Sequence, residues 1–289
     1  MKLPALDYVR PQSLDEAVAV LRAAGGSAKV LSGGQSLMPT MAFRLATPSL
    51  LVDLAGLPGL DRIEVASDGG LLLGARVRWV DLEQSPLVHT SQPLVAAAIE
   101  HVAHYQIRNR GTVGGSLAHA DPAAEWPGLC VTCDAMVEVF GPNGRERLPA
   151  AEFVVGPLST CLADDQIITA IHLPAWPADR RWAFREFARR RGDFALAGMA
   201  LFYDLDASGR LANVHVGVIG ACQKPHRLTG VEQMLEGQGA SDALFEAAAR
   251  CAAAEVDPPA DLHGSAAYRR GLVQTLLGRA LAEARARVH

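Results

Sequence analysis

Two stretches of the sequence place adjacent glycines among small hydroxyl-bearing residues. They are "LSGGQSLMP", residues 31–39, and "GTVGGSLAHADPAAE", residues 111–125. Glycine loses more conformational entropy on folding than other residues, so paired glycines are typical of a backbone with positive φ or of a close approach by another group. Successive N–H groups in such turns point into a concavity that suits a phosphate, and two turns could hold both phosphates of one dinucleotide. The alternative interpretation is a pair of ordinary tight turns.

The better-known motifs for nucleotide binding and hydrolysis are absent from the sequence. Neither glycine stretch fits G-x-G-x-x-G or G-x-x-x-x-G-K-[ST], which disfavours a nicotinamide-type Rossmann site and a Walker ATP site. No G-x-S-x-G elbow occurs, which removes the most obvious class of hydrolase.

Cysteine and histidine residues raise the question of a metal site. The chain has five cysteines, an odd number, and only Cys130 and Cys133 form a C-x-x-C pair. A zinc site would require these two to converge with His101, His104 or His119 at tetrahedral geometry. Because no second C-x-x-C pair follows, we favour reduced cysteines that pack as small apolar residues.

Capping residues and periodicity predict the elements around the first glycine pair. "SLDEAVAVLRAAGG" predicts a helix with Ser13 as N-cap, Glu16 completing a capping box and Gly25 ending it. A strand at residues 29–31 then runs into the glycines, and residues 50–54 predict a buried strand. The opening of the chain is therefore β/α in character.

The middle of the chain predicts two hairpins and two helices. The hairpins turn at residues 68–70 and 142–144, where Gly follows Asp or Asn between apolar runs. Residues 93–106 predict one helix that begins at a proline, and Asp121-Pro122 predicts the start of another.

The C-terminal part predicts three strands and a helical tail. A strand ends at Leu173, and a Pro-Trp-Pro segment near residues 174–177 marks the main domain boundary. Strands follow within residues 181–190, 197–205 and 212–220, and an Ala-rich helical tail begins at about Asp242.

Length and composition restrict the class of protein. A chain of 289 residues suggests two domains, and 49% hydrophobic with 20% charged residues is ordinary for a soluble globular protein. A net charge of −4 argues against a nucleic-acid-binding surface. No run approaches the roughly 18 apolar residues of a membrane span, and the N-terminal residues lack an apolar core of signal-peptide length. We therefore expect a cytoplasmic protein.

Two longer segments resemble a known family. "SGGQSLMPTMAFRLATPSLLVDL" and "QIRNRGTVGGSLAHADPAAEWP" are similar to the flavin-binding medium subunits of the molybdenum hydroxylases. That group includes carbon monoxide dehydrogenase and the quinoline and nicotine oxidoreductases, with the flavin domain of xanthine dehydrogenase as a relative. The similarity in layout runs from the N-terminus to the helical tail, and the two segments together are specific.

The resemblance implies an α+β fold. An FAD-binding domain of the vanillyl-alcohol-oxidase type, with a small parallel sheet, a larger antiparallel sheet and helices, precedes a C-terminal α+β domain. We place the FAD-binding domain at residues 1–176, with two α/β subdomains divided near residue 56, and the C-terminal domain at residues 177–289.

The resemblance also implies site residues, because both glycine pairs wrap the FAD pyrophosphate in that family. The implied residues are Leu31, Ser32, Gly33, Gly34, Gln35 and Ser36, together with Gly111, Thr112, Val113, Gly114, Gly115 and Ser116. An acidic residue near the adenosine half matches Asp121 or Glu125.

The segment "FREFARRRGDFALAG" matches the one that meets the isoalloxazine ring, with Arg185 and Phe194 as candidates. If its strand alternates, Trp182 and Phe184 share one face, while Arg181 and Arg185 share a face toward the flavin edge or a neighbouring subunit. The alternative is a solvated face.

The implied function is electron transfer. In the family, a large partner binds a molybdopterin cofactor and hydroxylates the substrate, a small partner carries two [2Fe-2S] clusters, and FAD passes the electrons to an outside acceptor. We expect a dimer of heterotrimers, no metal site and no catalytic base or nucleophile on this chain, because iron–sulfur sites need clustered cysteines. The alternatives are a self-standing FAD oxidase or reductase of the same fold and a scaffold that has lost the flavin.

Overall fold

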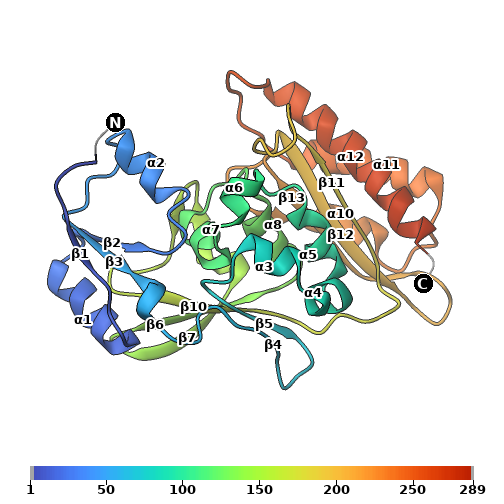
Figure 1. The fold of residues 1–289 in the computed structure, drawn as a ribbon. Helices are drawn as coiled ribbons and strands as arrows, with labels where there is room; N and C mark the ends of the chain where they lie inside the picture. The colour runs from blue at the N-terminus through green and yellow to red at the C-terminus, as the bar shows by residue number, and fades with distance from the viewer. Residues whose placement is uncertain (1–2, 288–289) are drawn as a thin grey trace.

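The computed structural model describes residues 3–287 and contains three main sheets (Figure 1). Residues 1–2 and 288–289, the outer ends of the two predicted domains, lie outside the described part. Within it, the predicted order is confirmed: a small parallel sheet, a larger antiparallel sheet and a C-terminal part with its own sheet and helices. Within it, too, no helix is both long and apolar enough to cross a membrane.

The N-terminal sheet is parallel and has the strand order β1-β3-β2. Its strands and helix are β1 (Asp7–Val9), α1 (Leu14–Ala24), β2 (Ala28–Leu31) and β3 (Leu50–Asp53), followed by the 3-10 turn η1 (Leu54–Gly56). Ser13 Oγ accepts a hydrogen bond from the Glu16 N–H, and Gly25 ends the helix with φ of 55°. The predicted helix and both predicted strands are confirmed.

The second sheet is antiparallel and has the order β4-β5-β10-β6-β7. Its strands are β4 (Ile63–Val65), β5 (Leu71–Gly74), β6 (Met136–Gly141), β7 (Gly144–Pro149) and β10 (Ile167–Leu173). The pairs β4–β5 and β6–β7 are the two predicted hairpins. A short helix and a two-stranded ribbon lie between β7 and β10: α9 (Ala150–Phe153), β8 (Val154–Gly156) and β9 (Ser159–Thr160).

Short helices occupy the segment between β5 and β6, with α2 (Leu37–Ala42) earlier in the chain. They are α3 (Trp79–Glu83), α4 (Pro86–Ser91), α5 (Pro93–Ile99), α6 (Tyr105–Arg108), α7 (Val113–His119) and α8 (Glu125–Thr132). Two predictions here were wrong. Residues 93–106 form no single helix, because the chain turns at Ala103 with φ of 46°. No helix begins at Asp121-Pro122 either: the Asp121 carboxylate accepts a hydrogen bond from the Ala123 N–H, and α8 begins at Glu125.

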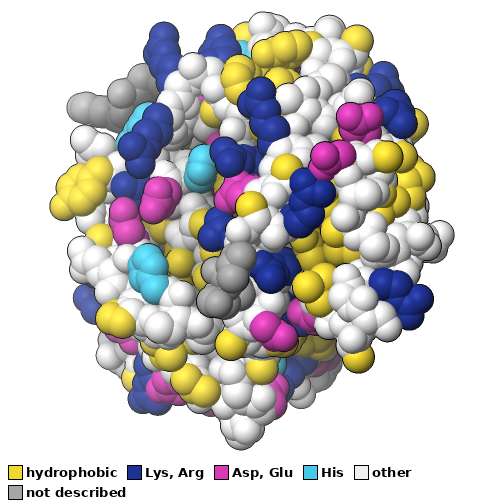
Figure 2. All heavy atoms as spheres, turned by 90° about the vertical axis from the view of Figure 1, so that its right-hand side faces the viewer, with side chains coloured by type: hydrophobic (Ala, Val, Ile, Leu, Met, Phe, Trp, Pro, Cys, Tyr) yellow, Lys and Arg dark blue, Asp and Glu magenta, His cyan; other side chains and the backbone are white. Residues whose placement is uncertain are grey.

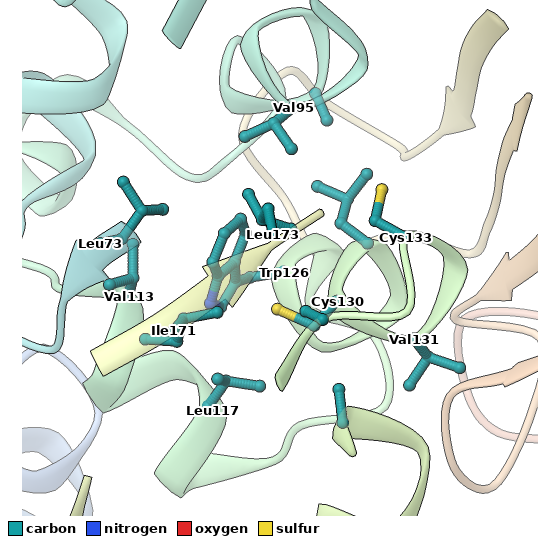
Figure 3. Close-up of a cluster of buried hydrophobic side chains, with 14 of the residues drawn as sticks. Leu73, Val95, Val113, Leu117, Trp126, Cys130, Val131, Cys133, Ile171 and Leu173 are labelled. Atoms are coloured by element: carbon teal, nitrogen blue, oxygen red, sulfur yellow. The ribbon is translucent and has the colours of Figure 1, made fainter. Parts of the chain in front are cut away.

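A large apolar cluster lies between the second sheet and the helices (Figure 3). Cys130 and Cys133 are buried in it, and in Figure 3 their sulfur atoms point in different directions among hydrocarbon side chains. The packing expected for this pair is confirmed, whereas Cys161 is exposed, contrary to expectation. Residues 3–287 contain no group of three or more His, Cys, Asp or Glu side chains arranged to hold a metal ion.

The C-terminal part is a four-stranded antiparallel sheet with helices on one face (Figure 1). Its elements are β11 (Arg181–Phe187), β12 (Ala197–Leu205), β13 (Leu211–Ile219), β14 (His226–Arg227), α10 (Thr229–Leu235), α11 (Asp242–Glu255) and α12 (Ala266–Ala286). All three predicted strands and the helical tail are confirmed. Figure 2 shows the side of the molecule on the right of Figure 1, where basic and acidic side chains lie interspersed.

The strand β11 has one buried face and one face that α12 covers in part. Trp182 and Phe184 share one face, as predicted, and join the cluster that contains Trp126 of α8. On the other face, Arg185 Nε lies 2.6 Å from Glu283 Oε2 of α12. This second face therefore packs against α12 and does not line the cleft, whereas its contact with a neighbouring subunit stays a prediction.

Candidate cofactor site

The first glycine turn, residues 32–36, connects the end of β2 to the start of α2. Gly34 has φ of 71°, a left-handed conformation that a residue with a side chain adopts only under strain. Ser36, the N-cap of α2, makes no side-chain capping hydrogen bond. Within the described part of the chain, no acceptor meets the backbone N–H groups of Gly34, Gln35 or Ser36. These donors are therefore available to a ligand.

The second glycine turn, residues 111–116, forms the start of α7. Thr112 is the N-cap, and its Oγ1 accepts a hydrogen bond of 3.2 Å from the Gly115 N–H. The Gly114 N–H donates to the Ala75 carbonyl at 2.9 Å, which anchors the turn to the chain that leaves β5. A Cβ on Gly114 would lie 2.6 Å from the Ala75 Cβ, so this glycine permits a close approach of two backbones.

The two glycine turns touch each other. Ser32 Oγ and Thr112 Oγ1 lie 3.0 Å apart, within hydrogen-bond distance. A Cβ on Gly33 would overlap the Arg110 carbonyl and lie 2.9 Å from the Gly111 Cα. Gly33 is therefore required for contact between the turns, whereas Gly34 is required for the backbone conformation.

A cleft of about 650 Å³ opens beside these turns. This volume is within the range of pockets that hold a small molecule or cofactor. Its wall includes both glycine turns, parts of α7, the segment before α6, the chain around β9 and the loop that follows β11. The residues from the C-terminal part are Gly192, Asp193 and Phe194.

Most of the predicted site residues line this cleft. They are Ser32, Gly33, Gly34, Gln35, Ser36, Gly111, Thr112, Gly114, Gly115, Ser116, Asp121, Glu125 and Phe194. The structure does not bring Leu31, Val113 or Arg185 to the wall: Val113 is fully buried in the apolar cluster, and Arg185 pairs with Glu283. Arg185 is therefore not retained as a ligand contact.

Several lining residues were not found from the sequence. Lys29 comes from the middle of β2, His119 from the last turn of α7, and Asp193 from the loop before Phe194. Asp193 could have been predicted, because it directly precedes Phe194, which was a predicted contact. Lys29 and His119 gave no such signal, because single polar residues in a short strand and a short helix are usually solvated.

The acidic part of the wall has unusual electrostatics. Glu125 is only 5% exposed, and burial, followed by the nearby Asp121 carboxylate, raises its pKa to about 7. Burial also raises the pKa of Glu186 on β11 to about 9, with the Glu125 charge adding to the effect. Glu125 lines the cleft, whereas Glu186 lies behind its wall.

The residues present fit a dinucleotide diphosphate. Unpaired backbone N–H groups at a turn of positive φ, a helix N-terminus and small hydroxyl side chains are the donors that bind phosphate without steric conflict. The donors come from the first glycine turn, while the second turn supplies the Thr112 and Ser116 hydroxyl groups beside it.

Two known protein families together match almost the whole chain. A family described as the FAD binding domain in molybdopterin dehydrogenase matches residues 4–176, and the carbon monoxide dehydrogenase flavoprotein C-terminal domain matches residues 182–284. The chain is 44% identical to the nicotine 6-hydroxylase medium subunit of Paenarthrobacter nicotinovorans, over 99% of this chain and 100% of that one. It is 35% identical to the carbon monoxide dehydrogenase medium chain of Hydrogenophaga pseudoflava, over 98% of each chain.

Solved structures give the same result. A chain of carbon monoxide dehydrogenase from Hydrogenophaga pseudoflava superposes with a TM-score of 0.96 at 35% identity, over 100% of both chains. A chain of quinoline 2-oxidoreductase from Pseudomonas putida 86 superposes with a TM-score of 0.93 at 34% identity, over 99% of both chains.

Proposed function

Because the chain belongs to the family of FAD-binding medium subunits of molybdenum hydroxylases, we propose that it carries electrons from iron–sulfur clusters through FAD to an external acceptor. The observation that supports this most strongly is the meeting of the two glycine turns at one cleft, through Ser32 and Thr112. One turn alone would be an ordinary structural feature, whereas two in contact form a single binding surface.

The residues of the glycine turns would hold the FAD diphosphate. The N–H groups of Gly34, Gln35 and Ser36 supply hydrogen-bond donors, and the start of α2 adds the positive end of a helix dipole. Ser116 and Thr112 supply hydroxyl groups on the opposite segment. Bound FAD supplies the redox chemistry, since a flavin accepts electrons singly and holds two.

The loop before β12 would close the other end of the cleft. Phe194 is 61% exposed and lines the cleft, so it presents an apolar ring to whatever occupies it. An exposed phenylalanine at a ligand site is suited to contact a planar aromatic group. We therefore keep Phe194 as the proposed contact of the isoalloxazine ring.

We further propose that the substrate reacts on a partner subunit. The relatives are named as medium subunits or medium chains, which implies larger and smaller companions. The proposed assembly is a dimer of heterotrimers with a large molybdopterin subunit and a small subunit that carries [2Fe-2S] clusters. The cysteines of this chain suit neither cofactor, since Cys130 and Cys133 are buried in the apolar cluster.

Purification of the chain alone and with its partners tests this proposal. The chain alone is expected to bind FAD and to show no substrate-dependent reduction. The complex is expected to reduce its flavin when substrate is added, as stopped-flow absorbance would show. Substrate turnover by the lone, metal-free chain would favour a self-standing oxidase or reductase instead, and a colourless chain that gains no FAD would favour a scaffold without flavin.

A further inference from the structure

The loop that carries Phe194 is anchored at both ends. At its start, Gly192 packs against the preceding part of the chain, since a Cβ added there would overlap the His104 ring. At its end, Ala195 and Leu196 are buried. Phe194 lies between these two anchors, is exposed and lines the cleft. The position of its ring therefore depends on what holds Leu196.

Arg269 of α12 holds the end of this loop. Its Nη1 donates a hydrogen bond of 2.8 Å to the Leu196 carbonyl and one of 3.1 Å to the Gly220 carbonyl. Both carbonyls lie just beyond the last pair of the β12–β13 ladder, which is Gly198 with Ile219. Because a buried carbonyl without a donor is costly, the Arg269 side chain supplies donors at the point where strand pairing ends.

The guanidinium group of Arg269 is itself held in place. The residue is 4% exposed, and its Nη2 donates to Asp261 Oδ2 at 2.8 Å. Asp261 lies in a tight turn that its Oδ1 closes by accepting from the N–H groups of His263 and Gly264. A planar guanidinium offers its donors in fixed directions, so it can span two carbonyls and a carboxylate at once. Arg269 is therefore a rigid link between this turn and the loop of Phe194.

Gly220 joins the same point to the N-terminal part of the chain. Its N–H donates to the Pro122 carbonyl at 2.9 Å, and Pro122 directly follows Asp121 of the cleft wall. Gly220 has φ of 71°, and a Cβ added to it would lie 2.5 Å from the Ala195 carbonyl oxygen. Arg269 thus contacts the backbone where the N-terminal and C-terminal parts of the cleft wall meet.

We propose that Arg269 is a positioning residue, which fixes the loop of residues 192–196 so that Phe194 faces the occupant of the cleft. Arg269 does not itself line the cleft, so it acts through Leu196 and Phe194 and not by contact with the occupant. This inference rests on the proposed function only in taking the occupant to be FAD. The fixing of the loop can be measured without a cofactor.

Hydrogen exchange of the full chain without FAD, followed by mass spectrometry, tests the fixing of the loop. In segment 192–197 the Leu196 N–H donates to the Phe187 carbonyl at 2.9 Å, so its exchange requires the loop to open. Arg269→Lys keeps the positive charge but cannot span both carbonyls and the carboxylate. Exchange in this segment is expected to become faster by roughly ten- to a hundredfold, the factor that matches a lost hydrogen bond to a buried charged group.

Arg270→Lys is the matched control for Arg269→Lys. Arg270 lies on the same helix but donates to the Val256 carbonyl at 3.3 Å and to Asp257 Oδ1 at 3.2 Å, away from the cleft wall. The control is expected to leave exchange in segment 192–197 unchanged. Equal exchange rates of this segment in the two variants would overturn the proposal.

Asp261→Asn covers the case in which Arg269→Lys does not fold. Asparagine keeps the oxygen that closes the turn but replaces the acceptor of Arg269 with an amide nitrogen. Exchange in segment 192–197 is expected to become faster by roughly tenfold, since one hydrogen bond to the guanidinium is lost. If Arg269→Lys does not fold, unchanged exchange in Asp261→Asn would overturn the proposal in its place.

A double-mutant cycle in the complex tests whether Arg269 acts through Phe194. Phe194→Ala and Arg269→Lys are each expected to change the rate of flavin reduction or reoxidation by roughly tenfold, and the double variant is expected to match Phe194→Ala alone, because the effects of coupled residues do not add. Stopped-flow absorbance measures the rates, and visible circular dichroism of the flavin reports its surroundings. Independent effects that multiply in the double variant would overturn the action through Phe194.

Failure of the proposed function would give a different result. A chain that binds no FAD, or flavin rates that Phe194→Ala leaves unchanged, would contradict the proposed contact with the isoalloxazine ring. Neither outcome affects the exchange measurement, which decides by itself whether Arg269 fixes the loop.

Discussion

Ser32 Oγ and Thr112 Oγ1 lie 3.0 Å apart although 80 positions separate the two residues in the chain. The contact joins the loop after β2 to the N-cap residue of α7. Thr112 takes part in two interactions, since its Oγ1 also accepts from the Gly115 N–H. The two glycine turns of the proposed phosphate site are therefore linked through one hydroxyl group.

Removal of that hydroxyl group is expected to weaken both the fold and FAD binding. Thr112→Val keeps the shape of the side chain but loses the cap, at a cost of about 1 kcal/mol in the free energy of unfolding. FAD affinity is expected to fall by more than the loss of stability alone would cause, because the two glycine turns lose the contact between Ser32 and Thr112. Denaturant unfolding and fluorescence titration with FAD measure the two effects, with Thr112→Ser as the control that restores both. An unchanged FAD affinity in Thr112→Val would contradict the shared contact.

A side chain at Gly34 is expected to abolish tight FAD binding. Gly34→Ala strains the left-handed backbone by about 1–2 kcal/mol and places a methyl group 3.1 Å from Met38 Cγ, beside the free N–H groups. Gly237→Ala is a matched control, since Gly237 has φ of 72° and an added Cβ there meets nothing within 4 Å. Both variants should lose similar stability, and only Gly34→Ala should lose FAD. Equal flavin content in the two purified variants would argue against the phosphate site.

The contact between the two halves of the chain depends on Gly217. A Cβ there would overlap Thr132 Oγ1 of α8, which donates a hydrogen bond of 2.7 Å to the Gly128 carbonyl. Gly217→Ala is expected to lower the free energy of unfolding by about 1–3 kcal/mol, as overpacking does in other buried sites. Gly239→Ala serves as the control, because nothing lies within 4 Å of its added Cβ. Equal midpoints of urea unfolding for the two variants would show that α8 shifts to accommodate the methyl group without loss of stability.

Stability is expected to fall as the pH rises from about 5 to 9. The folded chain raises the pKa of Glu125 to about 7 and of Glu186 to about 9, above the value of about 4.3 in an unfolded chain. The folded state therefore binds more protons than the unfolded state over this range, and its advantage is complete below the unfolded pKa and lost above the folded one. Glu186→Gln is expected to flatten the pH dependence, and Glu246→Gln, whose side chain is 75% exposed, is expected to leave it unchanged. Parallel curves for wild type and Glu186→Gln would contradict this.

Phe194→Ala is expected to change the rate of flavin reduction or reoxidation while FAD affinity falls only modestly. Phe194 lines the cleft from the C-terminal part, whereas the diphosphate donors lie in the N-terminal part. Stopped-flow reduction by substrate and reoxidation by the acceptor measure the effect in the complex. Unchanged rates in both directions would place the isoalloxazine contact elsewhere.

Local patterns in the sequence predicted most of the elements. The helix after Ser13 and both hairpins were predictable because their caps, alternation and turn residues act over a few positions. The break at Ala103 was missed because no glycine or proline marks it. Its cause is tertiary, because Ala103 packs closely against Gly192 of the loop before β12. A Cβ added to Gly192 would lie 2.8 Å from the Ala103 carbonyl oxygen.

The site was predicted only in part. The glycine turns were recognisable because glycine leaves a local signal, and the family resemblance supplied the contact at Phe194. Gly115, however, has no positive φ, and a Cβ there would lie 2.9 Å from Thr112 Oγ1, so a side chain would disturb the cap rather than the backbone. Arg185 was misplaced, because the sequence does not show that α12 packs against its face of β11 and pairs Glu283 with it.

The contact between Gly33 and the Arg110 backbone also determines when the cleft can exist. During synthesis the first glycine turn leaves the ribosome several seconds before the second, since chains grow at roughly 5–20 residues per second. Phe194 follows after a similar delay. A nascent chain therefore has no complete cleft until the loop before β12 has left the ribosome, and the cofactor is enclosed only after that point.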